Sequence, residues 1–181
     1  MLCKADPEPR TAQKFPEASE GRTGPVQDGK EKAMDNRNFQ VRAIGEIAIR
    51  CVDYGAMVAF YRDVIGLSLM NDPDNTPIAF FRIAEGFGGH TAVLALFRHD
   101  VEGAGRAHGS PKPPGTGPAS SLHHLALSLP WDEQDAVMAW YEHLGRAYDV
   151  EYFDWVGWRG IFTLDPDGNT IELVAKDPDH R

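Results

Sequence analysis

The chain has 181 residues, of which 42% are hydrophobic and 25% charged, and its formal net charge is -9. This length and apolar content suit one globular domain or two small fused modules. The excess of acidic residues argues against a nucleic-acid partner, because binding to phosphates depends on Lys and Arg. The sequence has no apolar run near the roughly 20 residues that span a bilayer, and we expect no membrane partner.

The two cysteines, Cys3 and Cys51, lack the spacing of a metal site and do not suggest a disulfide framework. The amino terminus is too polar for a signal peptide. Both observations predict a cytoplasmic location.

Two segments have compositions typical of unstructured chain. Residues 1–40 are rich in Pro, Gly and charged side chains, and we expect a disordered N-terminal tail. Residues 100–121 combine flexible Gly and Ser with a Pro cluster, which predicts a flexible linker. These segments divide the chain into a first module at 41–99 and a second at 122–176, with a short tail at 177–181.

The first module begins with a predicted strand. Residues 45–52, GEIAIRCV, alternate in polarity and place Glu46 and Arg50 on the less apolar face. Asp53 is expected to cap a helix whose apolar residues recur at steps of three and four until Gly66. Three short strands are predicted to follow, over 67–70, 77–84 and 91–98.

The second module repeats this order. Residues 123–129, HHLALSL, place His124 on the face opposite three leucines. Asp132 is expected to cap a helix that ends near Gly145, and the likeness of AFYRDVIG to AWYEHLG supports a duplication. Strands are predicted over 150–155, 158–164 and 169–175, and the turn sequence DPDG joins the last two.

Three side chains are candidates for one cavity. Glu46, His124 and Glu172 lie on strand faces opposite the aliphatic residues expected under the helices. Imidazole and carboxylate together suit Fe(II), Mn(II), Ni(II), Co(II) or Zn(II), and three protein ligands leave positions for water and substrate. A glutamate on the solvent face of an edge strand is also ordinary, so this alternative stays open for Glu46 and Glu172.

Substrate contacts are expected from Arg50, Arg159 and Trp158. Arg50 shares a face with Glu46, and it either meets an anionic substrate or pairs with that glutamate. His123 is expected to be hydrogen-bonded and without a functional role.

Three segments, IGEIAIRCVDYGAMVAFYRDVIGLSL, LHHLALSL and FTLDPDGNTIEL, together resemble the vicinal oxygen chelate superfamily. This superfamily includes glyoxalase I, fosfomycin resistance proteins, extradiol dioxygenases and bleomycin resistance proteins. The likeness covers about residues 43–176. It implies an α+β fold of tandem βαβββ modules, whose curved mixed sheets surround a divalent metal and are often completed across a homodimer.

The resemblance also implies a set of ligands. His124 and Glu172 match family ligand positions, and Glu46 stands where His or Gln is common. The fourth position falls near Ala95, which cannot bind a metal. The implied protein is a divalent-metal-dependent lyase, isomerase or dioxygenase that acts on a small oxygenated substrate, with Glu46 or Glu172 carrying a proton.

A second interpretation remains open. A relative of the bleomycin resistance type would bind a small molecule in the same cleft without metal or catalysis. Aromatic side chains would then form its walls, namely Phe80, Trp155, Trp158 and Phe162.

Overall fold

The computed structural model describes residues 39–100 and 113–181, and residues 42–181 form one compact unit. The expected tail up to residue 38, and residues 101–112 of the expected linker, lie outside the described residues. In the first module the elements are β1 (Glu46–Cys51), α2 (Tyr54–Ala59), η1 (Phe60–Val64), β2 (Ser68–Leu69), β3 (Ile78–Glu85) and β4 (Thr91–Arg98). The elements that follow are η2 (Gly117–Ala119), β5 (Leu125–Ser128), η3 (Trp131–Glu133), α3 (Gln134–His143), β6 (Asp149–Phe153), β7 (Trp158–Leu164) and β8 (Thr170–Lys176).

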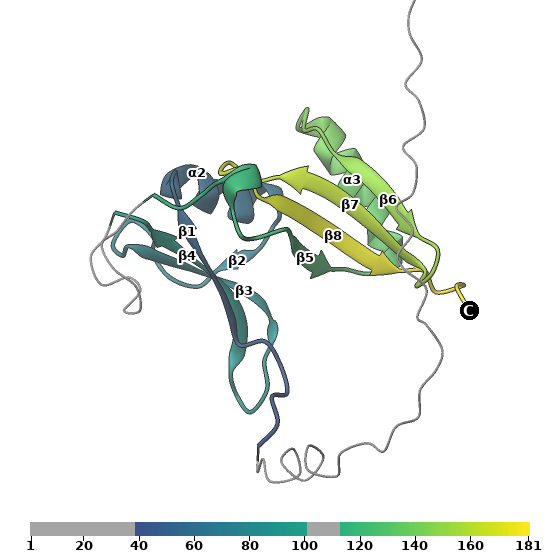
Figure 1. Ribbon diagram of the computed structural model, residues 1–181, viewed down its shortest axis with the longest axis horizontal. Coiled ribbons are helices and arrows are strands. Elements are labelled where there is room, and N and C mark those ends of the chain that lie inside the picture. Colours follow the sequence, from purple (N-terminus) through teal and green to yellow (C-terminus); the bar gives the residue numbers. More distant parts are fainter. Residues whose placement is uncertain (1–38, 101–112) are drawn as a thin grey trace, which may run out of the picture. The chain divides into compact units, whose positions relative to one another are not determined.

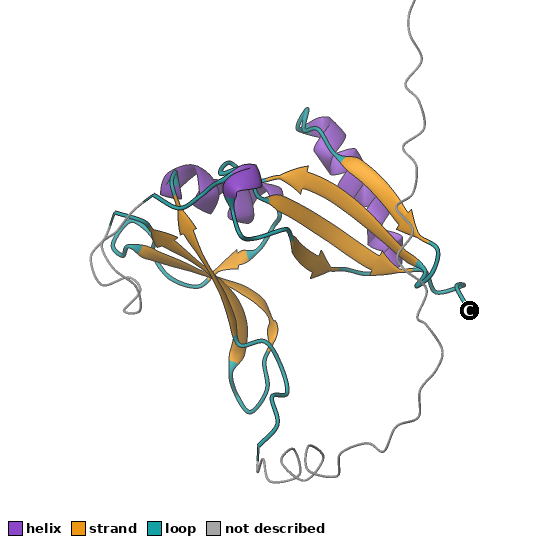
Figure 2. Cartoon of the chain, viewed as in Figure 1, coloured by secondary structure: helices purple, strands orange, loops and turns teal. Residues whose placement is uncertain are grey.

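The described strands form two four-stranded sheets of the same design (Figures 1 and 2). The first has the order β1-β4-β3-β2 and the second the order β5-β8-β7-β6. In each sheet the first strand pairs in parallel with the last, and the other pairs are antiparallel. The fold is therefore the α+β arrangement of tandem βαβββ modules that the sequence predicts.

The first helix begins and ends where the sequence predicts. The Asp53 side chain accepts a hydrogen bond from the Ala56 N–H at 3.0 Å, which confirms Asp53 as the cap. The helix continues into the π-helical turn η1, in which the Ile65 N–H donates to the Phe60 carbonyl at 3.1 Å. Gly66 then ends the helix with a φ of +81°, which a residue without a Cβ adopts readily.

The start of the second helix differs from the prediction. Asp132 does not cap α3 but lies inside the 3-10 turn η3, where the Glu133 N–H donates to the Pro130 carbonyl at 3.2 Å. This turn delays the α-helix to Gln134, and its N-cap residue Glu133 makes no side-chain capping bond. The prediction of an Asp132 cap is therefore wrong.

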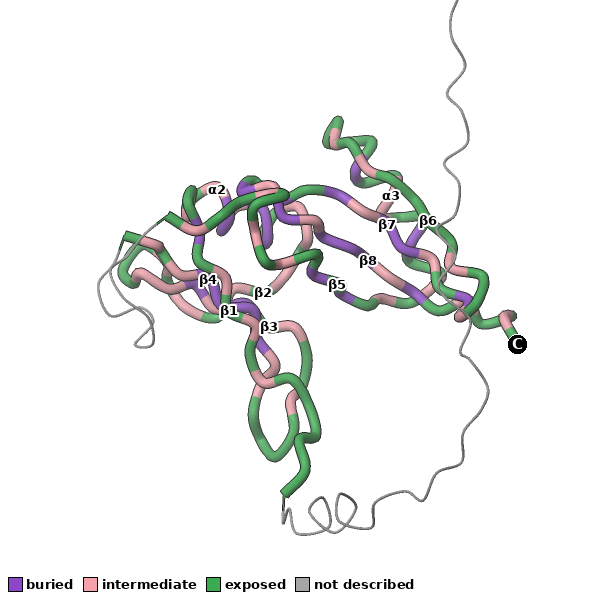
Figure 3. Tube along the Cα trace, in the orientation of Figure 1, coloured by how far each residue is buried: buried purple, intermediate pink, exposed green. Residues whose placement is uncertain are grey.

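Buried apolar side chains of both modules form one core cluster, to which β5 contributes alternate residues (Figure 3). The β7–β8 turn connects the modules by hydrogen bonds. Asp165 accepts a bond from the Tyr61 hydroxyl at 3.1 Å, and Asp167 accepts bonds from the N–H groups of Val52 at 2.8 Å and Asp53 at 3.2 Å. The DPDG sequence thus closes a hairpin and also binds the start of the first helix.

Among the helices in the described parts of the chain, none has the length and apolarity needed to cross a membrane.

Candidate metal site

The second sheet brings His124 and Glu172 together. The parallel register of β5 and β8 pairs Ala126 with Glu172, and His124 precedes the first residue of β5. Both side chains lie on the face opposite the buried leucines Leu125 and Leu127, here called the open face of the second sheet. The His124 Nε2 atom lies 3.3 Å from Glu172 Oε2, so two of the three predicted ligands converge.

Glu172 is a buried carboxylate. Its side chain is 8% exposed, whereas that of His124 is 37% exposed. Burial raises the pKa of Glu172, His124 opposes this rise, and Glu151 adds to it. Carboxylates with this degree of burial are usually paired or bound to a metal, which suits a cation at this point.

Gly160 makes room for the Glu172 carboxylate. A Cβ atom at Gly160 would lie 2.5 Å from Glu172 Oε1 and 2.7 Å from the Phe162 ring. The Glu172 carboxylate therefore fits at this position because Gly160 on β7 has no side chain. Sequence reasoning overlooked Gly160, although a glycine inside a strand is a known signal of close approach.

His123 contacts the candidate ligand His124. Their Nδ1 atoms lie 2.7 Å apart, and the rings meet at 72° with centroids 5.0 Å apart. The sequence interpretation expected His123 to be hydrogen-bonded, and the structure shows that its partner is the metal-ligand candidate.

Glu46 is not brought to this pair within the chain. It is exposed on β1 and makes no hydrogen bond or ion pair with the described residues. Among residues 39–100 and 113–181, no three His, Cys, Asp or Glu side chains lie close enough together to hold a metal. The residue of the first sheet that is equivalent to Glu172 is Ala95, because Ala95 pairs with Ala48 in the same way that Glu172 pairs with Ala126. The first sheet therefore has no metal ligand at this position.

The residues expected to contact substrate are separated by strand geometry. Trp158 shares the open face with Gly160 and is 45% exposed. Arg159 lies on the opposite face, where it donates to the Gln134 side chain at 2.5 Å, pairs with Asp135 at 3.2 Å and covers the Trp131 ring. The structure therefore does not bring Arg159 to His124 and Glu172, because adjacent residues on a strand point to opposite faces.

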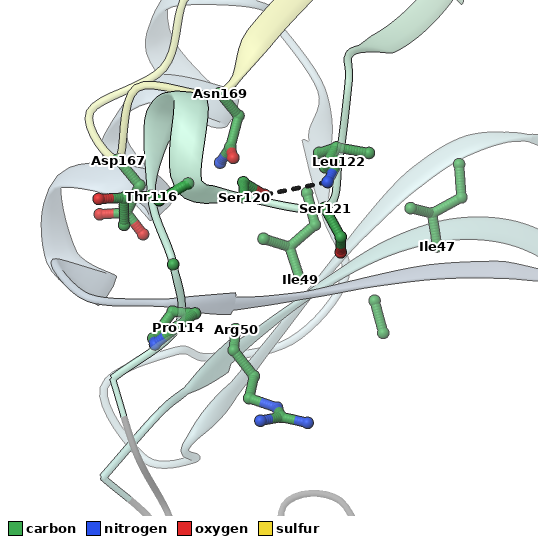
Figure 4. Close-up of a pocket in the computed structure, with 13 residues that line it drawn as sticks. Ile47, Ile49, Arg50, Pro114, Thr116, Ser120, Ser121, Leu122, Asp167 and Asn169 are labelled. Carbon is green, nitrogen blue, oxygen red and sulfur yellow. Dashed lines mark hydrogen bonds between the residues drawn. The ribbon is translucent and has the colours of Figure 1, made fainter.

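Arg50 lies at a different cavity of about 580 Å³, between β1 and residues 114–122. Its side chain extends away from Ser120 and Ser121 (Figure 4). Arg50 forms no ion pair with Glu46 or with any other described residue. None of the three predicted metal ligands lines this cavity.

A family model described as the Glyoxalase/Bleomycin resistance protein/Dioxygenase superfamily matches residues 43–173. A search of the curated proteins finds no match.

Solved structures share the fold at low sequence identity. A lactoylglutathione lyase from Agrobacterium tumefaciens is 24% identical, with a TM-score of 0.51 over 75% of this chain and 94% of that one. A glyoxalase/dioxygenase from Nostoc punctiforme is 21% identical, with a TM-score of 0.53, and the match covers 75% of this chain and 92% of that one. A third structure is that of a variant of the fosfomycin resistance protein FosX from Listeria monocytogenes, complexed with Mn(II) and 1S,2S-dihydroxypropylphosphonic acid. It is 16% identical to this chain, with a TM-score of 0.54, and the match covers 78% of this chain and 98% of that one.

Proposed function

The chain belongs to the glyoxalase/bleomycin resistance protein/dioxygenase superfamily, and from this premise we propose that it is a divalent-metal-dependent enzyme. Its substrate is a small molecule that offers vicinal oxygens to the metal. The reaction class is that of a lyase, an isomerase or a dioxygenase. The observation that carries the proposal is the 3.3 Å approach of His124 Nε2 to the buried Glu172 carboxylate.

The residues at this point fit a divalent metal. One imidazole and one carboxylate are ligands that Fe(II), Mn(II), Co(II), Ni(II) and Zn(II) accept. Gly160 leaves space for the carboxylate, and burial disfavours its negative charge unless a cation is near. The structure of the neighbour FosX contains Mn(II), which supports the proposal that this chain binds a divalent metal.

The third ligand in the proposal is Glu46 of a second copy of the chain. Glu46 is exposed on β1, at the free edge of the first sheet, where another molecule can approach it. A homodimer would then contain two equivalent sites, each with Glu46 from one copy and with His124 and Glu172 from the other. Closed twofold symmetry of this kind is the most common form of oligomer.

The bound metal would act as a Lewis acid that polarises a carbonyl or stabilises negative charge on a substrate oxygen. The protein side chains have separate tasks. Glu172 or Glu46 takes up and returns a substrate proton, which needs a carboxylate within hydrogen-bond reach of that proton. Trp158 on the open face packs against the apolar part of the substrate.

Metal analysis of the reconstituted protein tests this function. We expect one metal per chain in the wild type and loss of that metal in His124→Ala and Glu172→Gln. His143→Ala is the matched control, because His143 lies on α3 and stacks on Trp140. Absence of metal in the reconstituted wild type, or equal metal content in His124→Ala, would refute the proposal.

A metal-free binding protein is the second candidate. It is favoured by the lack of a three-ligand cluster among the described residues and by the aromatic side chains on the open face. Phe153 and Phe162 meet edge to face with centroids 6.4 Å apart, and Trp158 lies on the same side of β7. This candidate predicts quenching of the tryptophan fluorescence by an aromatic ligand in the presence of EDTA. Quenching that requires added metal excludes it.

A further inference from the structure

We infer that His123 is a positioning residue, which selects the ring nitrogen that His124 presents to the metal. The inference rests on the proposed metal site. It starts from the 2.7 Å separation between the Nδ1 atoms of the two rings. Two neutral imidazoles at this distance form a hydrogen bond in which one Nδ1 carries a proton and the other offers a lone pair.

When the metal is bound, Nε2 of His124 must offer its lone pair. The proton of that ring is then on Nδ1, and it is donated to Nδ1 of His123. His123 therefore carries its own proton on Nε2. This is the arrangement of a ligand histidine whose second nitrogen donates to a neighbouring acceptor, which orients the ring and makes it a better ligand.

Without the metal the same hydrogen bond runs in the opposite direction. The Glu172 carboxylate, 3.3 Å from Nε2 of His124, favours a proton on that nitrogen. Nδ1 of His124 is then the acceptor and Nδ1 of His123 the donor. On metal binding the Nε2 proton of His124 leaves to solvent, and the shared proton passes from Nδ1 of His123 to Nδ1 of His124. Nε2 of His123 takes up a proton from solvent, so the two rings carry two protons in both states.

Two substitutions of His123 separate this role from a general effect on packing. His123→Asn places an amide at the position of Nδ1, where it can donate in one state and accept in the other. His123→Gln places the amide further out, near the position of Nε2, where it misses His124. Because His123 is exposed, both variants are expected to fold.

We expect His123→Asn to bind Zn(II) as the wild type does in titration calorimetry. His123→Gln and His123→Ala should bind it about 10–100-fold more weakly, and His143→Ala should be unchanged. Equal affinities of the Asn and Gln variants would overturn the inference.

Nitrogen NMR of labelled histidine provides the second readout. During a Zn(II) titration of the wild type, the proton of His124 should move from Nε2 to Nδ1 while that of His123 moves from Nδ1 to Nε2. An unchanged tautomer at His123 contradicts the role assigned to it. If the wild type binds no Zn(II), the proposed function fails as well, whereas wild-type affinity in every His123 variant removes only this inference.

Discussion

Burial opposes the negative charge of Glu172, one of the proposed metal ligands. Its carboxylate is buried on the open face of the second sheet, and its partner at 3.3 Å is the half-exposed imidazole of His124. Burial of a carboxylate costs free energy unless the charge is balanced. A residue with this property, next to a glycine that makes room for it, is expected where a cation binds.

The pH dependence of stability tests this view of Glu172. Folding raises the pKa of Glu172 through burial, so the folded state holds the proton more tightly than the unfolded chain. The stabilising contribution is complete below the ordinary pKa of glutamate, about 4.3, and is lost as the pH rises through the higher folded-state pKa. In EDTA, the free energy of unfolding of the wild type minus that of Glu172→Gln should therefore fall as the pH rises above about 4.

Urea unfolding at several pH values measures this difference. A difference that rises with pH would mean that folding lowers the pKa of Glu172, and the electrostatic account of the site would be wrong.

Gly160→Ala tests the space around the carboxylate. The added methyl group would lie 2.5 Å from Glu172 Oε1, so either the carboxylate or β7 must shift. We expect a loss of about 1–3 kcal/mol in the free energy of unfolding and a fall of about tenfold or more in metal affinity.

Gly55→Ala is the control for this substitution. Its nearest atom, Asp53 Oδ1, lies 3.9 Å from the added methyl, and helix α2 favours alanine by about 0.5–1 kcal/mol. Unchanged metal affinity in Gly160→Ala would show that Glu172 does not depend on this space.

At the scale of the elements, the duplicated helices offer a matched pair of tyrosines. Tyr61 and Tyr141 occupy equivalent places in AFYRDVIG and AWYEHLG, and both are fully buried. The Tyr61 hydroxyl donates to Asp165, whereas the Tyr141 hydroxyl has no hydrogen-bond partner in the part of the chain that the structure describes.

Substitution by phenylalanine should therefore have opposite consequences in the two modules. Tyr61→Phe leaves the buried Asp165 short of one donor and should cost about 1–3 kcal/mol of unfolding free energy. Tyr141→Phe removes an unpaired polar group and should be neutral or stabilising. Thermal unfolding of both variants decides this, and equal losses would show that Tyr141 has a partner.

The elements were predictable where the sequence pattern matches one structural period. Alternation in polarity predicted the strands observed as β1 and β5, and Asp53 was a recognisable cap. The start of α3 was not predictable from Asp132 alone, because Pro130 begins a 3-10 turn that displaces the helix by one residue. The two-residue period of strands already separates Arg159 from Trp158, so the sequence itself argued against a shared site.

At the scale of the whole molecule, the sequence predicted the duplication and its two similar sheets, because each module repeats the same order of elements. Strand parity also made His124 and Glu172 candidates for one cavity, whereas the parallel register of β5 and β8 that brings them together is known only from the structure. The position of Glu46 could not be obtained in this way, because it depends on how sheet edges associate and not on any local pattern. Within the described chain Glu46 stays apart from the other two.

The proposed dimer would explain why Glu46 lies apart from His124 and Glu172 within one chain. If each site takes Glu46 from one copy and His124 with Glu172 from the other, neither module is sufficient alone. Size-exclusion chromatography with light scattering should show a species of twice the chain mass. Metal removal should shift that species toward the monomer, because ligands from two copies link assembly to metal binding.

The most direct test of the central claim mixes two inactive variants, Glu46→Ala and His124→Ala. Each variant alone should hold no metal when reconstituted. After the two are unfolded and refolded together, half of the dimers should be mixed, and each mixed dimer should contain one intact site, with Glu46 from one copy and His124 and Glu172 from the other. Restored metal binding in the mixture is the result we predict, and a mixture that remains as empty as its components would contradict the shared site.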